Sequence, residues 1–194
     1  MHVFRLIPQV ELVSNITLAY LSSSIEDRHA GQWWYPTANC IARGMADKFG
    51  ISVAQASGII AVLSPQISWE RNVVVAYAFM ASPYEKPTGI TTDNWRKAQH
   101  VFEGRLGYIR GNKVQAFHEC INTAGDTDAV VIDTHSVDVA LGEEARDKDK
   151  KYLVNKQIYD IFANAYREAA KHLKMPATEV QATTWVYHRN MKED

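Results

Sequence analysis

Apolar residues recur at every third or fourth position along most of the chain, the spacing that places them on one face of an α-helix. The first such stretch, within residues 10–24, carries this stripe on Val10, Val13, Thr17, Tyr20 and Leu21. A longer stripe near the other end comprises Ile158, Ile161, Phe162, Ala165, Tyr166 and Ala169. Only residues 129–132 are typical of an extended segment or of a buried approach to the next helix. The pattern therefore predicts an all-α protein of about eight to ten helices.

Prolines, glycines and capping residues indicate where these helices begin and end. Pro36 is expected near the start of a helix that Gly50 ends. Ser52 and Gln55 form the pattern of a capping box, which opens a very apolar helix reaching Leu63. That helix has little polar face and is predicted to lie in the core. Further helix starts are expected at Ser68, at Asp93 and at Thr178, which forms a second capping box with Gln181.

Composition and charge narrow the class of protein. Of 194 residues, 46% are hydrophobic and 22% are charged, and the formal net charge is −1. This balance argues against binding nucleic acid by bulk charge alone but permits a local basic face. Two cysteines, Cys40 and Cys120, are too few for a disulfide framework, and without several other ligands they cannot form a structural zinc site or an iron–sulfur cluster. With no long apolar run and no signal-peptide pattern, we expect a cytoplasmic protein without membrane partner, metal or organic cofactor.

The segment VVIDTHSVDVALG, residues 130–142, carries a carboxylate at the point where a buried approach becomes a helix. As a helix cap, Asp133 would accept backbone N–H groups of the first turn. In that case Asp133→Asn keeps the hydrogen bond and costs about 1 kcal/mol or less. As a functional group, the same residue would present an ionised carboxylate at a fixed point toward a substrate. The two interpretations are compatible.

Four motifs follow one another between residues 52 and 142. They are the turn Leu63-Ser64-Pro65-Gln66, a helix carrying Asn72 and Ala76, the turn Gly111-Asn112-Lys113 and the segment Ile132-Asp133-Thr134-His135. In order and character they resemble the helix-hairpin-helix DNA glycosylase superfamily, of which endonuclease III is a familiar member. The chain departs from that family at Ile109, where a hairpin glycine is usual, and it lacks the C-terminal cysteines of the iron–sulfur members.

The resemblance implies one glycosylase-like domain over residues 1–194, with two helical lobes around a central cleft. The first lobe is expected at about 50–142, with a helical hairpin at about 105–122. The second lobe is expected from the N-terminal helices, about 1–50, and the C-terminal helices, about 150–194.

The resemblance also implies roles for individual residues. Loss of a nucleobase leaves positive charge on the sugar, so the implied role of Asp133 is to stabilise that charge beside C1′. Lys113 is the implied nucleophile, whose amine attacks C1′ and forms a Schiff base. The implied DNA contacts are Gln66, which fills the gap left by a flipped base, Arg110, Gly111, Asn112 and His135. Candidates for lining a base pocket are Trp33, Trp34, Tyr35, Trp69, Gln181 and Trp185.

The expected partner is double-stranded DNA with one base flipped out, and the expected activity is that of a DNA glycosylase with AP lyase activity. A second interpretation is a phage-type amino acid:DNA transferase that modifies a hydroxymethyluracil-derived base and resembles the same superfamily. A third is a non-catalytic DNA-binding protein of the same fold. The presence of both Lys113 and Asp133 favours an enzyme, because a protein that only binds DNA needs neither. The structural alternatives are that Lys113 is an ordinary surface lysine, that Asp133 is only a helix cap, and that the candidate aromatic residues belong to the core.

Overall fold

The computed structural model describes residues 7–145 and 151–193. Within these ranges the chain forms nine α-helices, two 3-10 helices and no strand, which confirms the predicted all-α class. It divides into two compact units: unit 1 comprises residues 1–36 and 125–194, and unit 2 comprises residues 37–124. This division differs from the expected lobes in two places, because residues 125–142 group with the two ends of the chain and residues 37–49 group with the central part. The reason for the first difference is that the helix after Asp133 packs on helices from both ends, as described below.

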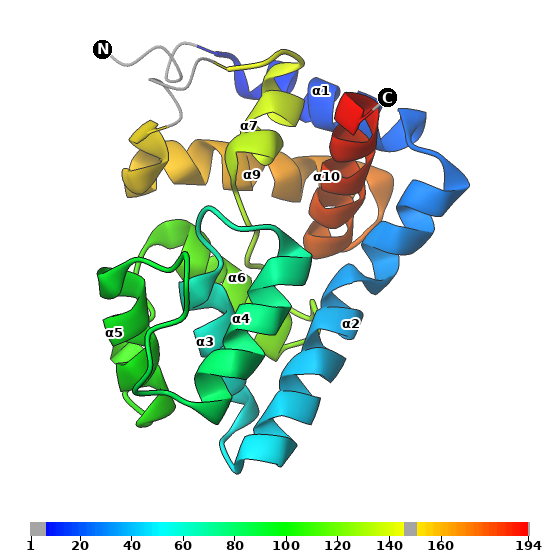
Figure 1. Cartoon of the computed structure of the whole chain (residues 1–194). Helices are drawn as coiled ribbons and strands as arrows, with labels where there is room; N and C mark the ends of the chain where they lie inside the picture. Colours follow the sequence, from blue (N-terminus) through cyan, green and yellow to red (C-terminus); the bar gives the residue numbers. More distant parts are fainter. Residues whose placement is uncertain (1–6, 146–150, 194) are drawn as a thin grey trace. The chain divides into compact units, whose positions relative to one another are not determined.

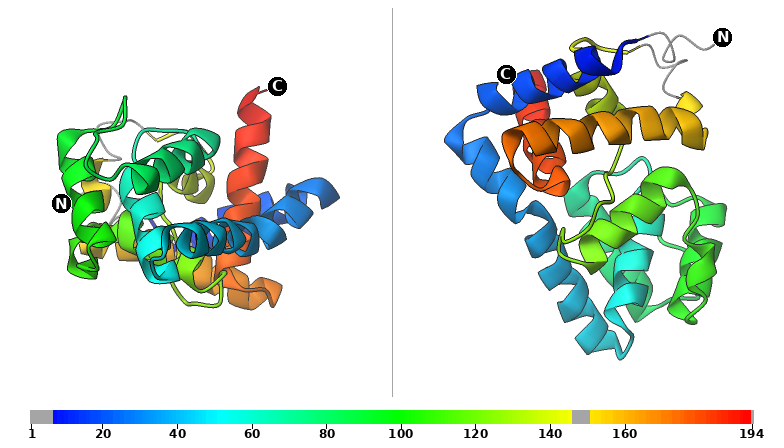
Figure 2. Two further views of the ribbon diagram at one scale, coloured as in Figure 1. Left: turned by 60° about the horizontal axis from the view of Figure 1, so that its bottom comes forward. Right: turned by 180° about the vertical axis from the view of Figure 1, so that it is seen from behind.

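Unit 2 is built around one buried helix, α3 (Val53–Leu63). Its N-terminus is closed by the predicted capping box, in which Ser52 and Gln55 bond each other's backbone N–H groups. Gly58 permits close packing on this helix, since a Cβ there would lie 2.6 Å from Cδ1 of Ile109. Figures 1 and 2 show the helices that pack around α3, which are α4 (Trp69–Ala81), α5 (Thr92–Phe102) and α6 (Asn112–Asn122), with the 3-10 helix η2 (Leu106–Tyr108) before α6.

Two helix starts differ from the sequence prediction. The helix α2 (Ile25–Phe49) begins well before Pro36, which therefore lies inside it. A proline there removes one N–H from the helical ladder, and the division between the units falls immediately after it. The N-cap of α5 is Thr91, and Asp93 lies in the first turn of that helix. The cap of α4 is Ser68, as predicted.

Unit 1 combines both ends of the chain. In Figure 1, α1 (Gln9–Ser22) lies alongside α9 (Lys156–Leu173), which the 3-10 helix η3 (Lys151–Val154) precedes. Two more helices, α7 (Thr134–Leu141) and α10 (Ala177–Glu193), contact both α1 and α9. The predicted core stripe of α9 is buried at Ile158, Phe162, Ala165, Tyr166 and Ala169.

The contact of α10 with the first half of α2 depends on a glycine. A Cβ at Gly31 would lie 2.1 Å from Oγ1 of Thr183 and 2.5 Å from its backbone nitrogen. The expected capping box at the start of α10 is not formed, because both side chains bond elsewhere. The hydroxyl of Thr178 donates to the Gly125 carbonyl at 2.9 Å, and Gln181 joins a buried network.

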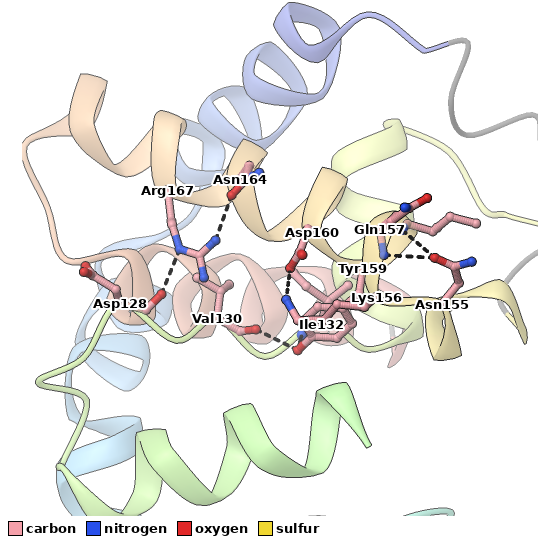
Figure 3. A network of polar contacts seen from close by, with 11 residues as sticks. Asp128, Val130, Ile132, Asn155, Lys156, Gln157, Tyr159, Asp160, Asn164 and Arg167 are labelled. Carbon is pink, nitrogen blue, oxygen red and sulfur yellow. Dashed lines mark hydrogen bonds and ion pairs between the residues drawn. The ribbon is translucent and has the colours of Figure 1, made fainter. Parts of the chain in front are cut away.

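The extended segment that precedes α7 is held by side chains of α9 (Figure 3). The Tyr159 hydroxyl donates to the Val130 carbonyl at 2.8 Å and accepts the Ile132 N–H at 3.0 Å. Farther along α9, Nε of Arg167 donates to the Asp128 carbonyl at 2.8 Å. Buried backbone groups need partners, and here side chains supply the bonds that a neighbouring strand would supply in a sheet.

Among the described residues, no single helix has the length and apolar character needed to cross a membrane. The consecutive helices α2 and α3 meet those criteria only as a pair bent by 115°.

Candidate functional site

Asp133 is the N-cap of α7, and donors from two helices orient its carboxylate. Oδ1 accepts the backbone N–H of Ser136 at 2.8 Å and lies 3.0 Å from the hydroxyl of that residue. Oδ2 accepts the indole Nε1–H of Trp185, on α10, at 2.9 Å. The helix cap predicted from the sequence is therefore confirmed, and the indole bond adds a contact that capping does not require. The side chain is half-buried, so part of it remains in contact with solvent.

The Asp133 carboxylate lies at the N-terminus of α7 and faces three hydrogen-bond donors. The N-terminus of a helix and charge-assisted hydrogen bonds both stabilise a negative charge. All three donors are neutral, so they orient the charge without cancelling it. Oδ2 accepts one bond within the described ranges, whereas a carboxylate oxygen can accept two. Asp133 is therefore an ordered carboxylate with capacity for one more donor or for a nearby cation.

A chain of buried hydrogen bonds supports Ser136, the residue that holds Asp133. The Tyr35 hydroxyl donates to Oε1 of Gln181 at 2.7 Å, and Nε2 of Gln181 donates to Oγ of Ser136 at 3.4 Å. The Tyr166 hydroxyl donates to the Ser136 carbonyl at 3.1 Å. Burial raises the pKa of Tyr166, so this phenol stays protonated and remains a donor. Tyr35 and Gln181, which we expected to line a pocket, are thus part of the interior of unit 1.

Aromatic rings gather around the indole that bonds Asp133. The Trp34 ring centroid lies 4.9 Å from that of Trp185, and the His135 ring meets Trp185 edge-on at 6.2 Å. The guanidinium of Arg189 lies 4.8 Å from the centre of the Trp185 ring. Trp33, directly before Trp34 in α2, is exposed. The structure therefore brings Trp34, Trp185 and His135 together beside Asp133.

The turn at Gln66 in unit 2 has an unusual backbone. Gln66 is exposed and has a φ of 69°, in the left-handed region where residues other than glycine are uncommon. A conformation of this kind persists where the surrounding chain imposes it, and it is found often at functional sites. The turn therefore holds the predicted gap-filling side chain at the surface of unit 2.

The predicted hairpin turn in unit 2 leads directly into α6. Gly111 has a φ of 98°, which favours glycine, and no atom of the described residues lies within 4 Å of a Cβ built there. Lys113 lies in the first turn of α6 and is half-buried. One turn later Phe117 meets the Trp69 ring edge-on at 6.3 Å. Because residues four apart share a helix face, the start of α4 lies beside the α6 face that carries Lys113.

The arginines around this turn are partly engaged. Nε of Arg110 donates to the Gly107 carbonyl at 3.0 Å, and its guanidinium lies 5.3 Å from the centre of the Tyr108 ring. Arg105 forms an ion pair with Glu103. The exposed Arg110 lies three residues before Lys113, and the half-buried Asn112 directly precedes it. Lys113 belongs to unit 2 and Asp133 to unit 1, so a shared cleft for the two groups stays a prediction.

Sequence reasoning missed three residues of this region: Ser136, Asp138 and His188. The hydroxyl of Ser136 bonds within the network, and the described chain places Asp138 and His188 with His135 as a group able to hold a metal ion. One local signal was available, because His135 and Asp138 are three residues apart on one predicted helix. No local pattern points to His188, which comes from another helix.

Fold and site together describe an all-α protein with an ordered carboxylate at a helix start, flanked by aromatic and histidine side chains. The chain belongs to a family of unknown function, DUF7178, with a match that spans residues 6–192. No curated protein and no solved structure matches the chain.

Proposed function

We propose that this chain is a DNA base-acting enzyme of the helix-hairpin-helix glycosylase kind, which breaks the N-glycosidic bond of a flipped nucleotide beside Asp133. The observation that carries the proposal is the orientation of the Asp133 carboxylate by Ser136 and Trp185. A helix cap needs one acceptor atom for the first turn. The second oxygen is held by an indole from another helix, an arrangement suited to fixing a charge where a cation develops.

Each residue has a defined task in this reaction. The Lys113 amine attacks C1′ of the sugar while the base leaves with the electrons of the glycosidic bond. Asp133 stabilises the positive charge on the sugar and accepts the proton that the amine releases. Opening of the sugar ring then gives a Schiff base, from which the DNA strand can be cleaved. The reaction requires both groups to face one cleft, which is part of the proposal.

The DNA contacts proposed for unit 2 follow from its two turns. The exposed Gln66 side chain fills the gap that the flipped base leaves in the duplex. The open backbone at Gly111 allows an N–H group to approach a phosphate, with Arg110 and Asn112 beside it. Trp34 and Trp185 provide aromatic surfaces near Asp133 on which a flipped base can stack. Binding should weaken steeply with salt, because each neutralised phosphate releases counterions.

The test uses duplex oligonucleotides that each carry one modified base. Sodium borohydride should trap a covalent protein–DNA complex, because it reduces the Schiff base formed by Lys113. Lys113→Gln should abolish trapping, and Lys171→Gln, at an exposed lysine of α9, is the matched control that should trap normally. Asp133→Asn should slow base release by about 100-fold or more while DNA binding is retained.

Mass spectrometry of released bases and nucleosides separates the possible outcomes. A free base together with a trapped complex supports the proposal. In a parallel reaction that supplies an amine and an oligonucleotide with an activated hydroxymethyluracil, a nucleoside that has gained the amine in place of the activating group would assign the transferase reaction to the same site instead. DNA binding without product from any substrate would leave only a binding function. Trapping that is unchanged in Lys113→Gln would refute the role of Lys113.

A further inference from the structure

Unit 1 contains a cluster of three metal-ligating side chains that the proposed reaction does not explain. His135 and Asp138 lie on α7, and His188 lies on α10. One ring nitrogen of each histidine and one carboxylate oxygen of Asp138 all lie within 4.8 Å of one another. Nε2 of His188 lies 3.8 Å from Oδ2 of Asp138. The two α7 residues are three positions apart, which places both side chains on one face of that helix.

The surroundings of the cluster distinguish it from a chance group of surface residues. Asp138 is only 2% exposed, and its Oδ1 accepts the Ala145 N–H at 2.9 Å, which orients the carboxylate. Nδ1 of His135 is buried and has no hydrogen-bond partner within residues 7–145 and 151–193. Buried polar atoms almost always have a partner, so this nitrogen indicates a ligand such as a metal ion or an ordered water.

We propose that His135, Asp138 and His188 bind one divalent transition-metal ion, with zinc as the ion to test first. Two imidazoles and one carboxylate form the ligand set of catalytic zinc sites and of non-haem iron sites. Three protein ligands leave a coordination position open for water or substrate. A divalent cation also compensates the charge of the buried Asp138 carboxylate, whose burial alone is unfavourable.

The distances fit such an ion after a small adjustment. Nitrogen and oxygen atoms bound to one zinc ion at about 2.0–2.1 Å lie roughly 3.4 Å apart in a tetrahedron. The atoms of this cluster, which spread over up to 4.8 Å, must therefore approach one another by up to about 1.4 Å. Rotation of the two half-buried imidazoles about their side-chain bonds supplies a movement of this size.

The metal site adjoins the candidate carboxylate. The His135 ring meets Trp185, and the indole of Trp185 bonds Oδ2 of Asp133. A bound ion and the Asp133 carboxylate would therefore share one aromatic environment within unit 1. The inference depends only on the three ligands and does not rest on the proposed base chemistry, so either can fail without the other.

The test measures metal binding directly with the full, untagged chain after treatment with a chelator and dialysis. Zinc is titrated by calorimetry, and cobalt(II) is titrated in parallel because its visible absorption reports nitrogen and oxygen coordination. We expect one ion per chain and a higher melting temperature in the presence of zinc, since a ligand that binds only the folded state stabilises it.

Conservative variants assign the site. His135→Gln and His188→Gln should each weaken zinc binding about tenfold or more and change the cobalt spectrum. Asp138→Asn should do the same while keeping an oxygen for the Ala145 N–H. His172→Gln is the matched control, because His172 is an exposed histidine of α9 paired with Glu168 at 3.4 Å. Circular dichroism verifies that each variant is folded.

Two results would overturn the inference. The first is the absence of zinc and cobalt binding by the folded parent chain. The second is binding that persists unchanged in both His135→Gln and His188→Gln, which would place the ion elsewhere. If one of these variants does not fold, the other decides the outcome together with Asp138→Asn.

Discussion

Replacing Asp133 with asparagine tests whether Asp133 is a simple helix cap or a carboxylate whose two oxygens are both held by hydrogen bonds. The carboxylate uses Oδ1 for the Ser136 N–H and Oδ2 for the indole of Trp185. Asparagine has one oxygen and one NH₂ group, so it can satisfy only one of these donors. If its oxygen caps α7, its NH₂ group faces the Trp185 N–H at a distance of about 3 Å, and two donors then oppose each other.

The expected loss of stability in Asp133→Asn follows from these hydrogen bonds. A hydrogen bond to a charged group contributes about 1.5–3 kcal/mol, against about 0.5–1.5 kcal/mol for a neutral one. The variant weakens the cap bond by roughly 1 kcal/mol and leaves the indole N–H without an acceptor at a further 1–3 kcal/mol. Because Asp133 is half-buried, water relieves part of this penalty. We expect a loss of about 2–3 kcal/mol, more than the ~1 kcal/mol of an ordinary cap.

A double-mutant cycle that combines Asp133→Asn with Trp185→Phe measures the interaction free energy between the Asp133 carboxylate and the Trp185 indole. Phenylalanine removes the indole donor, so the free energy lost in the double variant should be smaller than the sum of the single losses by about 1–2 kcal/mol. Unfolding in urea followed by circular dichroism gives all four values. Asp93→Asn, at an exposed residue in the first turn of α5, is the control and should cost about 0.5 kcal/mol or less.

Additive losses in this cycle would show that the indole bond does not orient Asp133. The argument from two-sided orientation would then fail, and Asp133 would be a cap alone.

Three further predictions concern the two units. Gly31→Ala should lower the free energy of unfolding by about 1–3 kcal/mol, because its Cβ meets Thr183. In the control Gly44→Ala, where none of the residues that the structure describes comes within 4 Å of the added Cβ, stability should not fall. Tyr159→Phe removes the hydroxyl that bonds two buried backbone groups, the Val130 carbonyl and the Ile132 N–H. The free energy of unfolding, measured in urea, should fall by about 2–4 kcal/mol. A loss under about 1 kcal/mol would contradict the role of Tyr159 in bridging these two groups. Burial lowers the pKa of His118 below its ordinary value of 6.5. The neutral His118 side chain therefore makes its full contribution to stability above pH 6.5, and this contribution is lost as the pH falls through the lower pKa of the folded state. The melting temperature should therefore drop on acidification, and His118→Gln should reduce that drop.

The helices and their buried faces could be read from the sequence. The stripe of α9, the capping box of Ser52 and the cap at Ser68 depend on residues within one or two turns of each other. Local periodicity reports which face of a helix is buried, and short side chains cap the helix that follows them. The cap at Asp133 was predictable for the same reason.

Local patterns failed where packing overrode them. Pro36 is usually a sign of a helix start, yet α2 continues through it. Thr178 and Gln181 have the spacing of a capping box, but Gly125 and Tyr35 offer them partners from distant parts of the chain. Such competition between local and distant hydrogen bonds cannot be judged before the partners are known.

The sequence by itself determined the all-α class, the positions of most helices and the placement of a carboxylate at the start of α7. Only the tertiary structure decided what surrounds that carboxylate. Trp185 lies 52 residues from Asp133 in the chain and bonds it because α7 and α10 pack together in unit 1. His188 reaches Asp138 through the same packing. The periodicity of a helix tells which face is buried but not which other helix covers that face, so contacts between distant side chains follow only from the packed fold.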